Sequence, residues 1–174
     1  RSATGTEGAI LLAVDAHLRA MEDRDGPDLV RLLGGVFAEY PGCVLDVDAE
    51  EPWLRAPASS LERGWVVEHE GHARGCIALT TRGDGVVMLR KCYLDARLRG
   101  RGWGRRLVEE VLAAARAAGA PAVELWTDTR FVTAHRVYER LGFQATGARR
   151  ALDDLSDTEE WHYALRLSDG DGEA

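Results

Sequence analysis

The segment from Arg97 to Leu107 combines glycine and arginine in a spacing that suits anion binding. It reads Arg-Leu-Arg-Gly-Arg-Gly-Trp-Gly-Arg-Arg-Leu. Glycine allows positive φ and lets a ligand approach the backbone closely. A segment of helical pattern follows, and the first turn of a helix offers free N–H groups and the positive end of its dipole. The segment therefore predicts a cradle for an anion, most often a phosphate.

The spacing of these glycines separates the known kinds of phosphate loop. A Walker loop ends in Gly-Lys-Ser/Thr, whereas Gly104 is followed by Arg105 and Arg106. A dinucleotide fingerprint counted from Gly100 places its third glycine at position 105, where this chain has arginine. Both nucleotide-binding classes are therefore disfavoured.

The elements that position this segment follow from hydrophobic periodicity and turn residues. Residues 43–60 show no clear period, and a long loop of this kind is often functional. We expect a mixed α/β sheet with helices on both faces. Its strands are expected at 18–21, 65–69, 74–81, 86–94, 123–127, 143–148 and 161–167, and its helices at 27–40, 105–118 and 133–141.

Two other segments resemble signatures of a known family. Residues 89–94 read Leu-Arg-Lys-Cys-Tyr-Leu, and residues 134–143 read Ala-His-Arg-Val-Tyr-Glu-Arg-Leu-Gly-Phe. Together with the Arg99-x-x-Gly102-x-Gly104 loop, they resemble the central strand, the second signature and the acyl-CoA pyrophosphate loop of the GNAT N-acetyltransferases. The resemblance covers roughly residues 17 to 167. It implies a GNAT-like, mostly antiparallel central sheet, with acetyl-CoA as co-substrate and no metal.

The resemblance also implies which residues bind the acyl donor. In the family the central strand splays from its neighbour and binds pantetheine, a role that falls here to Cys92, Tyr93 and Leu94. The loop amides would receive the pyrophosphate, and the side chains of Arg99, Arg101, Arg105 and Arg106 would add positive charge. The implied pyrophosphate-binding residues are Arg99, Gly100, Arg101, Gly102, Trp103, Gly104 and Arg105.

Acetyl transfer from a thioester to an amine needs a proton acceptor for the amine, stabilisation of an oxyanion and a proton donor for the leaving thiolate. Tyr138 matches the tyrosine of the family's second signature, which lies near the CoA sulfur. A phenol is protonated at neutral pH, so Tyr138 is expected to act as the general acid. A packed aromatic side chain is the alternative reading of this residue.

The general base stays open at the level of sequence. The candidates are Glu68, Glu70, Glu124, Asp46 and Asp48. Many family members use a chain of water molecules instead. Tyr40, Trp53 and the acidic loop that follows are expected to border the acceptor pocket.

Arg90 and Lys91 interrupt an otherwise apolar strand. Side chains alternate along a strand, so only one of the two is expected to face the acceptor. A cation there suits an acceptor with a carboxylate, although a charged side chain reaching the rim of the sheet explains the pair equally well. Family members often have Asn near the pantetheine, at the position that Phe131 occupies here. This difference places one contact with the acyl donor in question.

Composition narrows the class of partner and the compartment. The formal net charge of −7 disfavours non-specific nucleic-acid binding. The three cysteines, Cys43, Cys76 and Cys92, lack Cys-x-x-Cys spacing, which favours a reducing compartment. With no apolar run long enough for a membrane span, we expect a cytoplasmic protein without a membrane partner. A homodimer is a candidate assembly because dimers are common in the family.

The chain is expected to hold one domain. Residues 1–8 lack periodicity and read as disordered or derived from expression, residues 9–167 as the GNAT-like domain, and residues 168–174 as a flexible acidic tail. We expect an N-acetyltransferase that moves acetyl directly to a primary amine of a small molecule or amino acid. A non-catalytic acyl-CoA-binding sensor or interaction module is the alternative.

Overall fold

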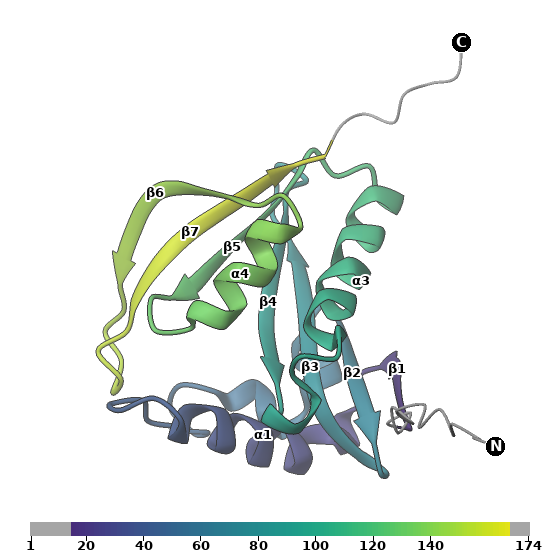
Figure 1. Cartoon of the computed structure of the whole chain (residues 1–174), viewed down its shortest axis with the longest axis vertical. Helices are drawn as coiled ribbons and strands as arrows, with labels where there is room; N and C mark the ends of the chain where they lie inside the picture. Colours follow the sequence, from purple (N-terminus) through teal and green to yellow (C-terminus); the bar gives the residue numbers. More distant parts are fainter. Residues whose placement is uncertain (1–14, 168–174) are drawn as a thin grey trace, which may run out of the picture.

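A seven-stranded mixed sheet runs through the computed structural model, which describes residues 15–167 (Figure 1). The strand order is β1-β2-β3-β4-β5-β7-β6, and all neighbours are antiparallel except β4 and β5. The strands are β1 (Ala16–Ala20), β2 (Arg63–His69), β3 (His72–Thr81), β4 (Val87–Leu94), β5 (Ala122–Asp128), β6 (Gln144–Ala151) and β7 (Glu159–Arg166). The terminal segments expected at 1–8 and 168–174 lie outside the described residues.

Helices cover both faces of this sheet, which confirms the expected fold class (Figure 1). The α-helices are α1 (Gly26–Ala38), α2 (Pro57–Ser60), α3 (Trp103–Ala117) and α4 (Val132–Arg140), and the 3-10 helices are η1 (Asp23–Asp25), η2 (Pro52–Arg55) and η3 (Ala96–Leu98). Within residues 15–167, none has the length and apolarity to cross a membrane.

Alternating side chains of the central strands build two separate cores. Val66 and Cys76 pack with α1 and η2, whereas Val67 and Ile77 pack with α3. This alternation is the period-two pattern of a strand buried on both faces. Helix α1 therefore lies on one side of the sheet, and α3 with α4 on the other.

The expected element boundaries agree with the structure to within about three residues, the usual uncertainty of helix and strand ends. The segment between Cys43 and Ser60 differs, because it contains η2 and α2 rather than irregular chain alone. Trp53 and Leu54 of η2 are buried against α1. Tertiary packing, which has no local sequence period, stabilises this short helix.

Strands β4 and β5 pair with each other at one end only. Among the described residues their parallel pairing comprises Val87 with Val123 and Met88 with Glu124. Beyond these pairs β4 continues to Leu94 and β5 to Asp128 without pairing to each other. The expected splay of the central strand from its neighbour is therefore present in the structure.

We predict opposite stability changes for two glycines of α1. A Cβ at Gly26 would lie 2.4 Å from the Leu54 carbonyl oxygen, whereas a Cβ at Gly35 meets nothing within 4 Å. Gly26→Ala should lower the free energy of unfolding by about 1–3 kcal/mol through overpacking. Gly35→Ala should raise it by about 0.5–1 kcal/mol, because alanine favours a helix interior. Urea unfolding midpoints measure both, and equal shifts in the two variants would contradict a tight α1–η2 contact.

Candidate functional site

The loop between β4 and α3 has the geometry of an anion cradle. Gly100 and Gly102 have φ of 72° and 83°, in the left-handed region that favours glycine. A Cβ added at either glycine would meet nothing within 4 Å. The Arg106 N–H donates to the Gly102 carbonyl at 3.0 Å, so the amides of residues 103–105 precede the helical ladder of α3. These N–H groups are available to an anion at the positive end of the α3 dipole.

The Arg99 side chain forms hydrogen bonds with two other residues of the protein. Its Nε and Nη2 donate to the Leu94 carbonyl at 3.1 and 2.9 Å, and its two terminal nitrogens pair with Glu39 at 2.6 and 2.8 Å. The Glu39 carboxylate raises the pKa of Arg99. Arg99 thus joins the end of β4 to the end of α1, and both its guanidinium and the Leu94 carbonyl are engaged in this structure.

The remaining loop arginines differ in how far they are engaged. Arg105 pairs with Glu109 at 2.6 Å, and the Arg106 guanidinium lies 4.3 Å from the centre of the buried Trp103 ring. Arg101 is exposed and has neither an ion pair nor an aromatic partner within the described chain. Arg101 is therefore the loop cation best able to meet a phosphate.

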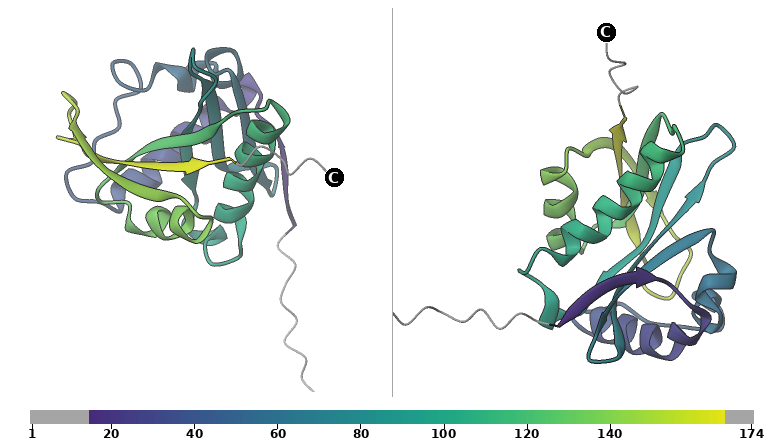
Figure 2. Two further views of the ribbon diagram at one scale, coloured as in Figure 1. Left: turned by 90° about the horizontal axis from the view of Figure 1, so that it is seen from above. Right: turned by 90° about the vertical axis from the view of Figure 1, so that its right-hand side faces the viewer.

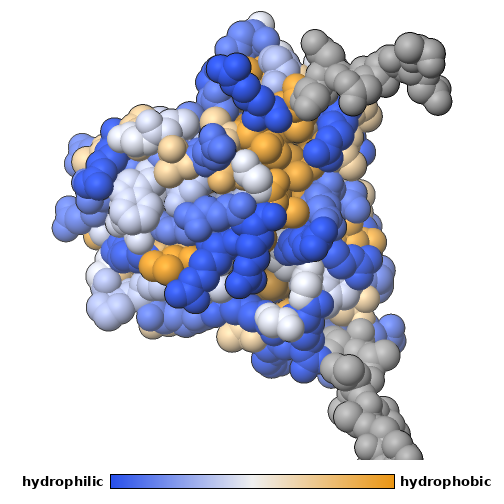
Figure 3. Space-filling model, turned by 45° about the horizontal axis from the view of Figure 1, so that its top comes forward, coloured by the Kyte–Doolittle hydropathy of each residue, from blue (hydrophilic) through white to orange (hydrophobic). Residues whose placement is uncertain are grey.

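A small, mostly apolar groove leads from this cradle into the molecule. Its volume is about 100 Å³. It follows the open side of β4 between the loop and α4. On the face of the molecule that Figure 3 shows, hydrophilic residues dominate the surface, and apolar residues gather mainly in one patch in the upper middle of the view. The groove is lined by Val36, Tyr40, Cys92, Tyr93, Leu94, Arg99, Gly104, Val108, Phe131, Thr133, Ala134, Val137 and Tyr138.

A larger polar cavity of about 740 Å³ lies beyond this groove. Two loops meet at its edge, one between α1 and η2 and the other between β6 and β7 (Figure 2, left). The Val44 N–H donates to Ser156 Oγ at 2.8 Å, and the Leu155 N–H donates to Glu50 Oε1 at 2.7 Å. The carboxylates that line the cavity are Glu50, Glu51, Asp128, Asp153, Asp154 and Glu160.

Tyr138 lies where the groove and the polar cavity meet. The residues that line both are Cys92, Tyr93, Phe131, Ala134 and Tyr138. Tyr138 is 4% exposed, and burial raises the pKa of its phenol well above the usual 10, with a smaller contribution from Cys92. The phenol is therefore protonated at neutral pH and adjoins both cavities.

A bulge in β4 alters the expected alternation of Arg90 and Lys91. Cys76 pairs with Tyr93 and Ala78 with Arg90, so Ile77 faces two residues of β4. Lys91 has a φ of 53° at this bulge. Both Arg90 and Lys91 consequently line the polar cavity, and the expectation that only one would face it is wrong.

The carboxylates that the sequence suggested as bases all lie outside the lining of the polar cavity; they are Glu68, Glu70, Glu124, Asp46 and Asp48. Glu68 instead pairs with Arg19 of β1 at 2.6 Å, and Glu124 pairs with Arg82 at 2.9 Å. The residues missed by that reasoning include Glu51 and Glu160. Glu51 lies in the long loop at residues 43–60, and that position could have indicated a role in the site. No sequence pattern pointed to Glu160.

Aromatic residues near the cavities differ in part from expectation. Tyr40 borders the groove rather than the polar cavity, with its ring 4.9 Å from that of Phe131. Phe131, in place of the family's asparagine, forms a wall of both cavities. Trp53 lies beneath Lys91, whose Nζ is 5.3 Å from the ring centre.

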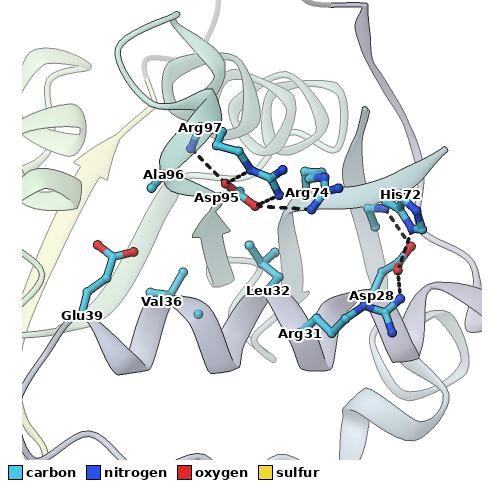
Figure 4. Close-up of a pocket in the computed structure, with 12 residues that line it drawn as sticks. Asp28, Arg31, Leu32, Val36, Glu39, His72, Arg74, Asp95, Ala96 and Arg97 are labelled. Atoms are coloured by element: carbon cyan, nitrogen blue, oxygen red, sulfur yellow. Dashed lines mark hydrogen bonds and ion pairs between the residues drawn. The ribbon is translucent and has the colours of Figure 1, made fainter. Parts of the chain in front are cut away.

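A separate cavity of about 470 Å³ lies between α1, the start of β3 and η3 (Figure 4). Most of its charged groups pair with one another: Asp28 accepts from Arg31 and lies 3.1 Å from His72, and Asp95 pairs with Arg97 at 2.9 Å. Neither Tyr138 nor the glycine cradle lines it. We therefore take the groove and the polar cavity as the candidate site.

His69 and His72, which flank the turn between β2 and β3, each lie beside a carboxylate. His69 lies 3.8 Å from Glu70, and His72 lies close to Asp28. In the part of the chain that the structure describes, no group of three or more His, Cys, Asp or Glu side chains is placed to bind a metal.

Known proteins share both the sequence pattern and the fold. The model of the acetyltransferase (GNAT) family matches residues 28–143. The N-acetylaspartate synthetases of Rattus norvegicus and Homo sapiens are 33% identical over 117 residues, which is 65% of this chain and 38% of each relative. The chain thus spans about two fifths of the length of these curated relatives.

Solved structures extend the likeness over most of the chain. A GNAT-family acetyltransferase from Staphylococcus aureus superposes with a TM-score of 0.75 at 17% identity, covering 88% of this chain and 99% of that one. An acetyltransferase from Salmonella typhimurium, solved with acetyl-CoA, gives a TM-score of 0.68 at 17% identity, with 92% and 98% covered. At this identity the likeness establishes the fold.

The environment of the cysteines predicts their reactivity. Burial raises the pKa of the Cys92 thiol to about 11, and burial raises that of Cys76 further. At pH 7.5 a thiol of that pKa is thiolate in about one molecule in 3,000. We expect iodoacetamide to label Cys43 first and Cys92 to react appreciably only in strong alkali, as followed by peptide mass spectrometry. Rapid labelling of Cys92 at neutral pH would contradict the raised pKa of its thiol.

Proposed function

Because the chain belongs to the GNAT acetyltransferase family, we propose that this N-acetyltransferase moves acetyl from acetyl-CoA directly to the primary amine of a small molecule or amino acid. The observation that carries the proposal is the position of Tyr138, at the junction between the groove and the polar cavity. The donor occupies the cradle and groove, and the acceptor occupies the cavity. The two substrates then meet beside one protonated phenol.

The cradle and the groove suit the acyl donor in charge and shape. Residues 100–105 present backbone amides to the pyrophosphate at the start of α3, whereas the Arg99 N–H already donates to the Ala96 carbonyl at 3.3 Å. Arg101 adds a cation that has no ion pair within residues 15–167. Cys92, Tyr93 and Leu94 border the narrow apolar part, where the uncharged pantetheine arm would lie. Because Arg99 already occupies the Leu94 carbonyl, the arm would bind other groups of β4.

Transfer requires one bond to form and one to break. The amine nitrogen attacks the thioester carbonyl, and the C–S bond breaks from the tetrahedral intermediate. Tyr138 gives its proton to the leaving sulfur, as a general acid does. The proton released by the amine nitrogen restores the phenol through solvent, so the products are an N-acetyl amide and a free thiol.

Solvent in the polar cavity is our choice for the first acceptor of the amine's proton. Glu51 pairs with Lys91 at 2.6 Å, Glu160 pairs with Arg150 at 2.5 Å and Asp128 pairs with Arg130 at 2.7 Å. A carboxylate engaged by a cation must give up that ion pair to accept a proton. The cavity is large enough to hold water beside a small acceptor.

Thiol release from acetyl-CoA in the presence of an amine panel tests the activity. The panel should contain simple amines, aminoglycosides and amino acids. The name of the N-acetylaspartate synthetases places aspartate among the amino acids to be tried. Acetyl-CoA binding without thiol release for any amine would favour the alternative of a non-catalytic acyl-CoA-binding module.

Replacing Tyr138 separates catalysis from binding. Tyr138→Phe should lower kcat by about 100-fold or more, because it removes the proton donor, and should change the KM for acetyl-CoA by less than about threefold. The acid must keep its proton, and the pKa of Tyr138 lies well above 10. Wild-type kcat should therefore show no alkaline loss from this group below pH 10. An unchanged kcat in the variant would remove Tyr138 from the mechanism.

A pair of variants tests whether Arg99 positions the loop or contacts phosphate itself. Arg99→Met and Glu39→Gln break the same ion pair. If the pair positions the loop, each should raise the KM for acetyl-CoA about fivefold, as expected for a loss of ~1 kcal/mol. A direct phosphate contact by Arg99 would instead give an effect in Arg99→Met alone. Steady-state kinetics with acetyl-CoA varied distinguish the two outcomes.

A further inference from the structure

The basic residues that line the polar cavity differ in whether a carboxylate pairs with them. Four of them line it, namely Arg82, Arg90, Lys91 and Arg150. Arg82 pairs with Asp84 at 2.7 Å and with Glu124 at 2.9 Å. Arg150 pairs with Glu160 at 2.5 Å, and its guanidinium lies 4.4 Å from the centre of the Trp126 ring. Two of the four are thus already engaged by carboxylates.

Lys91 is engaged as well. Its Nζ donates to Glu51 Oε2 at 2.6 Å, and the two side chains are 18% and 16% exposed. The same Glu51 oxygen accepts from Trp53 Nε1, and the Lys91 ammonium lies over the Trp53 ring. Separating this half-buried pair would leave a carboxylate without its cation, which is costly. Lys91 is therefore a structural part of the wall rather than a binding group for an anion.

Arg90 is the exception among these four. It is exposed, lines the cavity and has no ion pair or side-chain hydrogen bond within residues 15–167. The β4 bulge places it on the same side as Lys91. The guanidinium is a planar fork that binds a carboxylate through two parallel hydrogen bonds. Among residues 15–167, Arg90 is thus the one basic residue of the cavity lining without an ion-pair partner.

We propose, resting on the function proposed above, that Arg90 binds a carboxylate of the acceptor, which is a small amino acid. Arg90 precedes Cys92 by two residues on β4, with the bulge at Lys91 between them. Cys92 and Tyr138 mark the junction with the groove. An acceptor held at Arg90 by its carboxylate directs an amine a few bonds away toward that junction.

The test compares acceptors that differ at the carboxylate alone. Glycine and β-alanine, each beside its carboxamide, are assayed by thiol release with wild-type enzyme, Arg90→Met and Arg90→Lys. Arg90→Met should lower kcat/KM for the amino acids by about 10- to 100-fold, the range for a charged hydrogen-bond pair, and for the amides by less than about threefold. Arg90→Lys should recover part of the loss, because it restores charge without the fork.

Lys91→Met is the matched control, and it should alter amino acids and amides by the same factor. An equal effect of Arg90→Met on both classes, or no effect on either, would overturn the assignment of Arg90. Calorimetric binding of N-acetylglycine against N-acetylglycinamide gives a second readout that needs no turnover. Carboxylate-dependent binding lost in Arg90→Met, with no turnover by the wild type, would uphold the Arg90 site and reject the catalytic proposal.

Discussion

The separation of β4 from β5 is the constraint on which the rest of the site depends. The two strands pair at Val87 and Met88 and then diverge, so the edge of β4 from Cys92 to Leu94 stays open. Parallel strands in a complete ladder would close this edge with main-chain hydrogen bonds. The divergence instead lets the narrow groove and the wide polar cavity meet within the sheet, beside Tyr138.

Contacts on either side keep the opening in place. Strand β5 pairs with β7 along its whole length, from Ala122 to Asp128. The end of β4 is tied to α1 through Arg99 and Glu39. Helix α4 supplies Tyr138, whose ring packs against Phe143 and Tyr163 in the core on the α3 side. The position of Tyr138, the proposed general acid, is therefore set by the main core rather than by a surface loop.

Local sequence predicted the elements and the cradle because hydrophobic period, turn residues and glycine spacing are local signals. It also selected Tyr138, through the second signature and the resemblance that this signature carries. The sequence did not reveal that Arg99 is occupied by Glu39, 60 positions away, since such pairing depends on tertiary contact. Nor did alternation place Lys91 correctly, because a bulge adds a residue that no periodic pattern shows. Tertiary contact also explains why the candidate bases lie outside the polar cavity. Glu68 and Glu124 form ion pairs with arginines that are distant in the sequence.

The contact of the two loops at the cavity edge has an evolutionary consequence. Val44 and Glu50 belong to one loop, Leu155 and Ser156 to the other, and none of the four lines the donor groove. Under the proposed function, acceptor preference can therefore diverge between homologues while the groove is inherited unchanged. The two loops must diverge together, because a changed conformation in one loop must still form hydrogen bonds with the other. Transplanting both as a unit is accordingly the economical route to an altered substrate range.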